Sequence, residues 1–291
     1  MSATKRLVVC GGNGFLGSRI CKNAVQRGWD VTSISRSGAP RWDAITSSAT
    51  PPSWCHKVTW ERGDILRPAT YAPLLRGADF VVHSLGILLE ADYKGVLRGQ
   101  ESPIAGLRKA FTSAPQPGNP LARGVGQSDE EIRPPETREQ LTYENMNRDS
   151  AIMLAKEAAG ARASAFVYVS AAGGAPVLPA RYISTKREAE STIASEFPGM
   201  RNIFVRPPFL YDSSRPITMP MAAMTGLGAA FNGVTGGIFG NLMGAAGVKP
   251  LQVDVVAEAI VQALGNETVK GPVEVPQIEE LANKAWRTTM P

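Results

Sequence analysis

Three side chains have the types and the spacing needed for proton transfer to or from an oxygen atom. Tyr182 and Lys186 are four residues apart at the start of a predicted helix, so they share one helical face. An ammonium group beside a phenol favours the phenolate, so we expect a lowered pKa that lets Tyr182 exchange a proton near neutral pH. Ser170 lies twelve residues before Tyr182, and its hydroxyl could hydrogen-bond a substrate oxygen on which negative charge develops.

A strand has to place Ser170 beside this pair. Residues 165–170 are apolar up to the serine and predict a buried strand, and residues 142–158 have the periodicity of a helix before it. The alternative for Tyr182 and Lys186 is a surface tyrosine next to a solvated lysine, which the strand ending at Ser170 disfavours. In the favoured arrangement, the Lys186 ammonium could also hold the ribose hydroxyls of a nucleotide.

The amino-terminal segment has the composition of a phosphate-binding turn. An apolar run over residues 7–10 is followed by Gly11, Gly12, Asn13, Gly14, Phe15, Leu16 and Gly17. These glycines fit both the G-x-G-x-x-G and the G-x-x-G-x-x-G spacing. Glycine lets the chain turn sharply and approach a pyrophosphate closely, and the next helix can direct its N–H groups at the negative charge. A tight turn without a ligand is the alternative, but a predicted helix over residues 18–27 and a strand over 29–35 favour the dinucleotide site.

The end of that second strand predicts the kind of dinucleotide. A site that prefers NAD(H) carries Asp or Glu there, to accept a hydrogen bond from the ribose 2′-hydroxyl. This chain has Ser35, Arg36 and Ser37 instead. A guanidinium beside a hydroxyl suits a 2′-phosphate, so Arg36 and Ser37 favour NADP(H) over NAD(H). The alternative for Arg36 is a solvated surface arginine.

Two later segments complete the predicted cofactor contacts. Asp64 follows a predicted strand over residues 57–62, where a carboxylate can accept from an adenine amino group or, equally well, cap a helix. A buried strand over residues 78–85 then leads into a turn that could lie under the cofactor. The predicted contacts in this stretch are Ser84, Leu85 and Gly86.

Composition excludes some other classes of site. The formal charge of +5 over 291 residues is spread along the chain, which disfavours a nucleic-acid interface. The cysteines and histidines have no C-x-x-C or zinc-type spacing, so we expect neither a disulfide framework nor a metal site. They are Cys10, Cys21, Cys55, His56 and His83. The first strand begins by about residue 5, which leaves no room for a removable presequence and favours the cytosol without excluding the mitochondrion.

These elements predict an α/β fold, a Rossmann-like doubly wound parallel sheet with a small C-terminal substrate lobe. We expect a dinucleotide-binding domain over residues 1–205, with a polar, partly disordered insertion at about 90–139. Residues 206–291 would form the substrate-side lobe and return elements to the sheet, including a helix over 257–264. Residues 216–248 carry no charge and are rich in glycine, which suggests an apolar lid, an interfacial segment or a buried helix pair rather than a membrane span.

The motifs together resemble the extended and atypical branch of the short-chain dehydrogenase/reductase superfamily. The likeness rests on the glycine turn, Asp64, Ser170, Tyr182, Lys186, the Arg-Pro segment at 206–211 and the Val-Asp segment at 252–257. It also implies that Asn147 anchors a water relay. With these residues in place, hydride transfer between a nicotinamide and a substrate carbonyl or carbinol is possible, but members of this branch often lose turnover.

A narrower likeness is carried by residues 11–17, 33–38, 81–90 and 182–190. These segments resemble fungal mitochondrial proteins of ubiquinone (coenzyme Q) biosynthesis, which are related to the NAD(P)H-binding accessory subunit of respiratory complex I. The resemblance implies a mitochondrial location on the matrix side of the inner membrane, a quinone-synthesis protein complex as partner and a lipophilic, quinone-type substrate. A non-catalytic nucleotide-bound scaffold or redox sensor, and a cytosolic NADP-dependent reductase or epimerase, are the alternatives.

Overall fold

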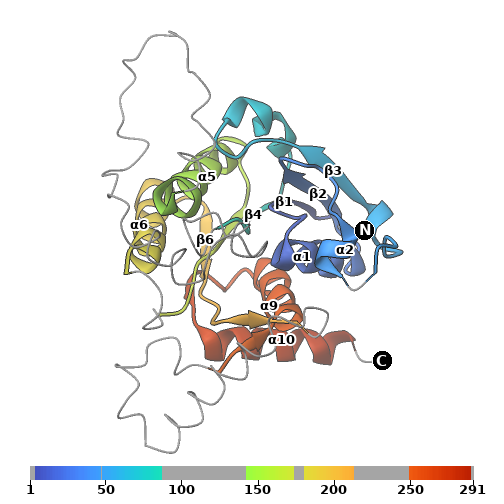
Figure 1. Ribbon diagram of the computed structural model, residues 1–291. Helices are drawn as coiled ribbons and strands as arrows, with labels where there is room; N and C mark the ends of the chain where they lie inside the picture. The colour runs from blue at the N-terminus through green and yellow to red at the C-terminus, as the bar shows by residue number, and fades with distance from the viewer. Residues whose placement is uncertain (1–3, 47, 87–141, 174–179, 213–248, 290–291) are drawn as a thin grey trace, which may run out of the picture.

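A seven-stranded parallel sheet forms the centre of the molecule (Figure 1). The computed structural model describes residues 4–46, 48–86, 142–173, 180–212 and 249–289. The strands are β1 (Arg6–Cys10), β2 (Asp30–Ser35), β3 (Val58–Arg62), β4 (Phe80–His83), β5 (Ala165–Val169), β6 (Arg201–Val205) and β9 (Gly271–Val273). They lie in the order β3-β2-β1-β4-β5-β6-β9, and every pairing is parallel. The predicted doubly wound sheet is therefore confirmed, with the order reversing between β1 and β4.

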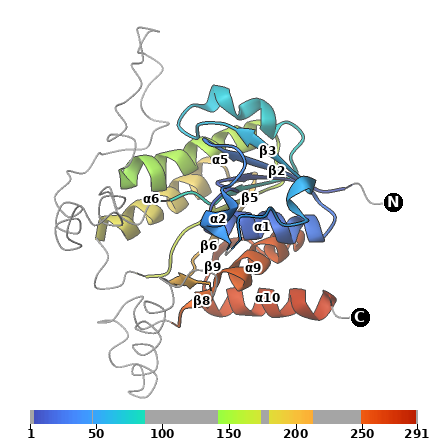
Figure 2. The ribbon, with the colours of Figure 1, turned by 45° about the vertical axis from the view of Figure 1, so that its right-hand side comes forward.

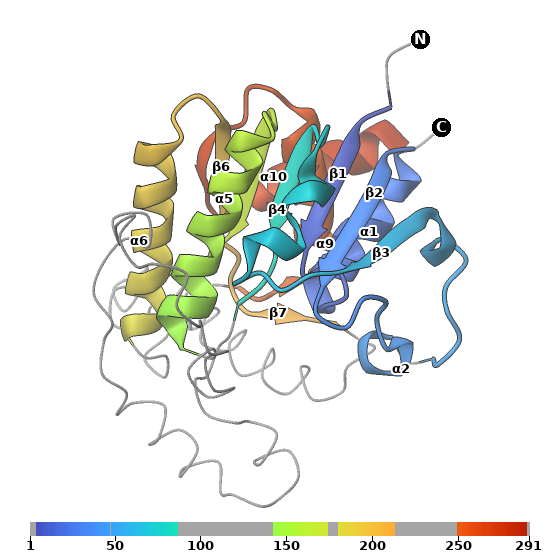
Figure 3. The ribbon, with the colours of Figure 1, turned by 90° about the horizontal axis from the view of Figure 1, so that it is seen from above.

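Helices cover both faces of the sheet (Figure 2). One face carries α1 (Phe15–Gln26), α9 (Val253–Gly265) and α10 (Val275–Thr289). The other carries α5 (Ser150–Gly160) and α6 (Ala180–Glu196), which lie side by side, whereas β3 lies at the opposite side of the sheet (Figure 3). Two layers of helix around a parallel sheet leave the carboxyl ends of all strands at one shared edge, where ligands bind in such folds.

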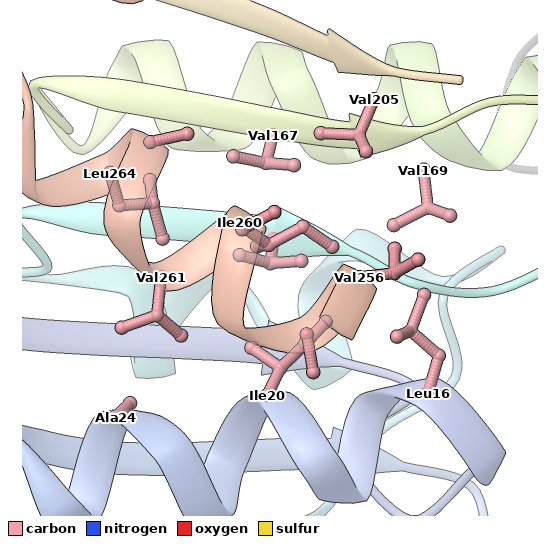
Figure 4. Close-up of a cluster of buried hydrophobic side chains, with 14 of the residues drawn as sticks. Leu16, Ile20, Ala24, Val167, Val169, Val205, Val256, Ile260, Val261 and Leu264 are labelled. Atoms are coloured by element: carbon pink, nitrogen blue, oxygen red, sulfur yellow. The ribbon is translucent and has the colours of Figure 1, made fainter. Parts of the chain in front are cut away.

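Successive side chains of the buried strands point to opposite faces of the sheet and so contribute to two hydrophobic cores. Leu7 and Val9 of β1 face α1, whereas Val8 and Cys10 face the opposite side. On the first face, α1 presents Leu16, Ile20 and Ala24 to α9 (Figure 4). Because these three residues recur at every fourth position, they form one apolar stripe. This packing fixes the start of α1, and with it the glycine turn, against the sheet.

Several shorter elements differ from the expectation. Between β3 and β4 the chain forms two 3-10 turns, Pro68–Thr70 and Ala72–Leu75, because prolines lack the N–H that a longer helix needs. A π-helix, Glu144–Asp149, precedes α5. The remaining pieces are α2 (Trp42–Ile45), a 3-10 turn (Cys55–Lys57), and the two-stranded sheet of β7 (Leu210–Tyr211) and β8 (Leu251–Gln252).

The described residues beyond 206 largely return to the main sheet. There β9 pairs with β6, and α9 and α10 pack on the face already occupied by α1. The domain boundary at 205/206 stays a prediction, and both the polar insertion and the charge-free segment lie outside the described residues. Within the described ranges, no helix combines the length and the apolar character that crossing a membrane requires.

Candidate functional site

The glycine turn between β1 and α1 has no room for a side chain at Gly12 or Gly17. A Cβ on Gly17 would lie 2.1 Å from the carbonyl oxygen of Gly11, and a Cβ on Gly12 would lie 2.4 Å from Ser33 Oγ. Gly11 itself has φ of +88°, in the left-handed region that favours glycine. Its N–H donates to the carbonyl of Ile34 at 2.8 Å, which ties the turn to the end of β2.

The turn exposes backbone to a ligand at the start of α1. Gly14 caps this helix without a side-chain hydrogen bond, and the first turn contains no acidic residue. The positive end of the helix dipole therefore faces the turn without a carboxylate to neutralise it. A turn that a Cβ would fill, followed by a helix N-terminus, fits the diphosphate of a dinucleotide.

A cavity of about 480 Å³ lies beside this turn. Its walls are Cys10, Asn13, Ile34, Ser35, Arg36, Ser37, Gly63, Ile65, Leu85 and Met146. Asn13 Nδ2 donates to Ser37 Oγ at 2.7 Å, so the turn and the end of β2 form one continuous wall. The structure thus brings the predicted residues Asn13, Arg36, Ser37 and Leu85 together around a space of the size that small-ligand sites have.

Asp64 makes local contacts at the end of β3. Its Oδ1 accepts from the N–H of Leu66 at 3.1 Å, and its Oδ2 lies 3.7 Å from Arg67 Nε. These contacts close a turn and do not cap a helix, because the 3-10 turn that follows begins at Pro68, with Arg67 at its N-cap position and no side-chain cap. Hydrogen bonding of Asp64 to an adenine stays a prediction.

The end of β4 joins the cofactor side to the proposed catalytic side. Ser84 Oγ donates to the carbonyl of Cys10 at 2.9 Å, next to the glycine turn. Two residues on, a Cβ added to Gly86 would lie 3.1 Å from Asn147 Oδ1 and 3.5 Å from Lys186 Nζ. Residues far apart in sequence therefore meet at Gly86.

Lys186 is buried at the centre of this region. Its Nζ donates to the carbonyl of Val169 at 3.0 Å and lies 5.0 Å from the ring centroid of Tyr168 and 5.6 Å from that of Tyr182. Burial lowers the pKa of Lys186 to about 7, against the attraction of Glu190. Burial therefore favours the neutral amine of Lys186 more than water does.

The expected lowering of the Tyr182 pKa is wrong for this structure. Burial raises that pKa, the nearby Tyr143 adds to the rise, and the positive charge of Arg187 opposes it. The two tyrosine rings meet edge to face at 5.8 Å. Lys186, whose own pKa is lowered by burial, does not offset this rise. Tyr182 is accordingly a phenol near neutral pH and suits the role of proton donor.

Ser170 is held by an arginine. Its Oγ accepts from Arg187 Nη1 at 2.9 Å, and Nη2 of the same guanidinium donates to the carbonyl of Ala171 at 2.7 Å. Arg187 Nη1 also lies 2.6 Å from Glu190 Oε1, and Glu190 in turn forms an ion pair with Arg206. The carboxyl ends of β5 and β6 are joined by this network.

Asn147 lies fully buried in the π-helix before α5. Its main-chain carbonyl accepts from the hydroxyl of Tyr168. Single π-helical turns inside longer helices are frequent at functional sites, because the extra residue changes which groups face the interior. The role of Asn147 in a water relay stays a prediction.

His83 and two of the cysteines are core residues. His83 Nε2 lies 2.8 Å from Ser150 Oγ, which donates to the carbonyl of Met146, so the imidazole is the donor in this contact. Burial lowers the pKa of His83 to about 3, and Lys186 adds to the shift. Cys10 and Cys21 are buried in β1 and α1, and burial raises the pKa of both thiols. Among the described residues, no cluster of His, Cys, Asp and Glu could hold a metal ion.

Comparisons with known proteins identify the family. The model of the NAD dependent epimerase/dehydratase family matches residues 7–94, which include the glycine turn and Arg36. MIOREX complex component 2 of Saccharomyces cerevisiae is 39% identical over 224 residues, which are 72% of this chain and 74% of that protein. The chain belongs to the NAD dependent epimerase/dehydratase family. This assignment confirms the predicted membership of the extended short-chain dehydrogenase/reductases.

Solved structures share the fold of this chain. The UDP-glucuronic acid 4-epimerase from Bacillus cereus, in complex with NAD, has a TM-score of 0.53 and 15% identity, covering 93% of this chain and 78% of that one. The Bordetella bronchiseptica enzyme WbmG, also in complex with NAD, has a TM-score of 0.51 and 12% identity, covering 100% and 80%. At these identities, the likeness establishes the architecture only.

In this epimerase/dehydratase family member, the structure brings most of the predicted residues to one sheet edge, together with two residues that were not predicted. Arg187 and Glu190 follow Lys186 on α6 and hold Ser170 in place. Their separation of three residues suits an ion pair on one helical face, which was the signal available. What the spacing could not indicate is that the pair faces the sheet edge.

Proposed function

We propose that the protein is an NADP(H)-binding member of the short-chain dehydrogenase/reductases that serves ubiquinone biosynthesis. The observation that carries the nucleotide assignment is the glycine turn at residues 11–17, where Gly12 and Gly17 leave no room for a Cβ and which opens on a cavity walled by Arg36 and Ser37. Arg36 in place of an acidic residue supports a 2′-phosphate. The role in quinone synthesis is supported by the likeness of four sequence segments to proteins of that pathway.

The residues of this chain have distinct proposed roles around the cofactor. Bound NADP(H) would supply hydride transfer. Gly11, Gly12 and Gly17 give its diphosphate access to the backbone, and Lys186 would hold ribose hydroxyls. Tyr182 would donate or accept a proton at the substrate oxygen, with Ser170 polarising that oxygen.

Asn147 is assigned to the water relay that would replace the proton of Tyr182. Gly86 supports this role, because its lack of a side chain keeps the space between Asn147 Oδ1 and Lys186 Nζ open. The substrate side then begins where Lys186 and Ser170 meet the end of β5. A lipophilic, quinone-type substrate is the class that the resemblance implies.

We assign the protein to the mitochondrion, at the matrix side of the inner membrane, within a protein assembly. The sequence likeness to mitochondrial proteins supports the location, and the yeast relative is named as a component of a complex. A cytosolic reductase or epimerase is the alternative. Fractionation of cells producing the tagged, full-length protein separates these two assignments.

A non-catalytic scaffold or redox sensor is the second candidate function. Two observations favour it: burial raises the pKa of Tyr182, and the Ser170 oxygen already accepts a hydrogen bond from Arg187. Both candidates predict nucleotide binding, so turnover has to separate them.

Replacing Tyr182 by Phe tests whether chemistry is needed. If the protein is an oxidoreductase, Tyr182→Phe abolishes quinone synthesis in cells that lack the normal copy but leaves NADPH affinity within about twofold, because only the proton donor is lost. Quinone content and nucleotide affinity are the two measurements. Tyr211→Phe, at β7, is the matched control and should preserve both. Normal quinone content in the Tyr182→Phe cells would contradict the oxidoreductase and favour the scaffold.

A further inference from the structure

Two arginines at the carboxyl ends of β2 and β3 differ from most others in their charge environment. Many arginines of the described chain form an ion pair with a carboxylate. These are Arg6, Arg19, Arg27, Arg41, Arg67, Arg148, Arg181, Arg187 and Arg206. Arg36 and Arg62 are exposed and have no such partner among the residues that the structure describes. Their positive charges are therefore available to an anion.

The sheet places these two arginines next to each other. Arg62 is the last residue of β3 and pairs in register with Ser35, the residue before Arg36. The N–H of Gly63 donates to the carbonyl of Ser35 at 3.0 Å, which keeps the two chain ends together beyond the strands. Gly63, the residue after Arg62, is itself a wall of the cavity that Arg36 lines.

Gly38 lets the Arg62 side chain lie across the turn that follows β2. A Cβ at Gly38 would lie 3.3 Å from Arg62 Cγ and 3.7 Å from Arg62 Nε, so the arginine stem contacts this turn. Gly38 has φ of +75°, and Ser35 Oγ donates to its carbonyl at 2.8 Å, which closes the turn. The guanidinium of Arg62 is thus held within a few ångströms of the segment that carries Arg36.

A hydroxyl completes the set of donors. Ser37 Oγ accepts its hydrogen bond from Asn13, so its own hydrogen is free to donate into the cavity. The two acidic residues next to Arg62 in sequence do not neutralise its charge. Asp64 is engaged by Arg67 and by the Leu66 N–H. Glu61 precedes Arg62 on the strand, so its side chain faces the opposite side of the sheet.

We propose that Arg62 is a second specificity-determining residue, which together with Arg36 binds the 2′-phosphate of NADP(H). The inference rests on the proposed function and adds to it a residue on a different strand. A phosphate monoester carries close to two negative charges, and two guanidinium groups match its charge and its oxygen geometry better than one. Discrimination against NADH is therefore shared between β2 and β3.

Nucleotide titrations of the full chain test this proposal without any substrate. Intrinsic fluorescence would report the Kd for NADPH and NADH in the unaltered protein and in Arg36→Gln, Arg62→Gln and the double variant. We expect Arg62→Gln to weaken NADPH binding by about tenfold, since each guanidinium makes charge-assisted hydrogen bonds, and to change the NADH Kd by less than about twofold. Arg76→Gln is the matched control. Arg76 is also exposed, but it precedes β4 and therefore lies at the amino ends of the strands, away from the cavity.

Adenosine 2′,5′-bisphosphate and 5′-AMP are the probes that isolate the 2′-phosphate. Arg62→Gln should weaken the first and leave the second unchanged, and Arg62→Lys should retain part of the preference because it keeps the charge without the planar fork. If Arg62→Gln leaves the NADPH/NADH ratio unaltered while Arg36→Gln abolishes it, Arg62 has no such role although the proposed function stands. Equal affinity of the unaltered protein for NADPH and NADH would overturn the 2′-phosphate site. Absence of binding to every nucleotide would overturn the proposed function itself.

Discussion

Close packing at single glycines decides whether the diphosphate turn can form. A Cβ at Gly17 would lie 2.1 Å from a backbone oxygen, which cannot move without opening the turn. We predict that Gly17→Ala lowers the free energy of unfolding by on the order of 1–3 kcal/mol, the usual effect of overpacking. Gly160, at the end of α5, has nothing within 4 Å of an added Cβ. The Gly160→Ala variant should unfold at the same urea concentration as the unaltered protein or a slightly higher one. An equal loss of unfolding free energy in both variants would argue against the steric explanation.

The buried imidazole of His83 makes stability depend on pH. Burial lowers its pKa from 6.5 to about 3, so the unfolded chain takes up a proton first as the pH falls. The stability contributed by neutral His83 is present above pH 6.5 and is lost as the pH falls toward 3, by on the order of 1 kcal/mol per pH unit. Urea unfolding from pH 6.5 down to pH 4 should show a shallower fall for His83→Gln than for the unaltered chain.

His56 provides the matched control for this measurement, because it is the other histidine and is exposed. The His56→Gln variant should retain the full pH dependence. If His83→Gln has the same dependence as the unaltered protein, burial of the neutral imidazole is not its source.

Sequence reasoning at the residue scale succeeded where residue type alone fixes the chemistry. Only glycine tolerates the positions at Gly12 and Gly17, so their spacing was informative. The predicted direction of the Tyr182 pKa shift was wrong because it depends on burial of the phenol, which spacing does not encode. Arg187 was missed because an arginine near a glutamate on a helix is usually a solvated pair.

At the scale of elements, a buried carboxylate on α6 joins the ends of two strands. Glu190 is 4% exposed and pairs with both Arg187 and Arg206. We predict that Glu190→Gln destabilises the protein by about 3 kcal/mol or more, because two guanidinium groups lose their buried counter-charge. Urea denaturation measures this loss, and Glu280→Gln, which removes an exposed pair with Lys284 on α10, is the control that should unfold almost normally. A similar midpoint for both variants would show that the network adds little stability.

The central strands were predictable and the irregular elements were not. β1, β2 and β5 are runs of apolar and β-branched residues between turn signals, so their ends agree with the predictions to within one residue. The π-helix contains a tertiary contact that local pattern does not encode, in which Tyr168 donates to the Asn147 carbonyl. Strand β9 was not predicted, because its three residues are too few to show periodicity. They include Pro272, and proline is tolerated in a strand mainly at the edge of a sheet.

At the scale of the whole molecule, the parallel sheet explains why residues from both halves of the chain meet. Gly11, Arg36, Gly86 and Ser170 each follow the end of a different strand, and carboxyl ends of parallel strands share an edge. The hydrophobic cores on both faces hold α1 and α6, and hence Gly17 and Lys186, against that edge. Fold class follows from the alternating strand and helix pattern, whereas the reaction does not, since one fold supports many chemistries.

Isothermal titration calorimetry of the full-length, folded protein with NADPH and NADH tests the central claim most directly. We expect a saturable heat that fits one nucleotide per chain, with NADPH binding more tightly than NADH. No measurable heat with either nucleotide, on protein shown to be folded by its cooperative unfolding, would contradict the claim that this sheet edge binds a pyridine dinucleotide.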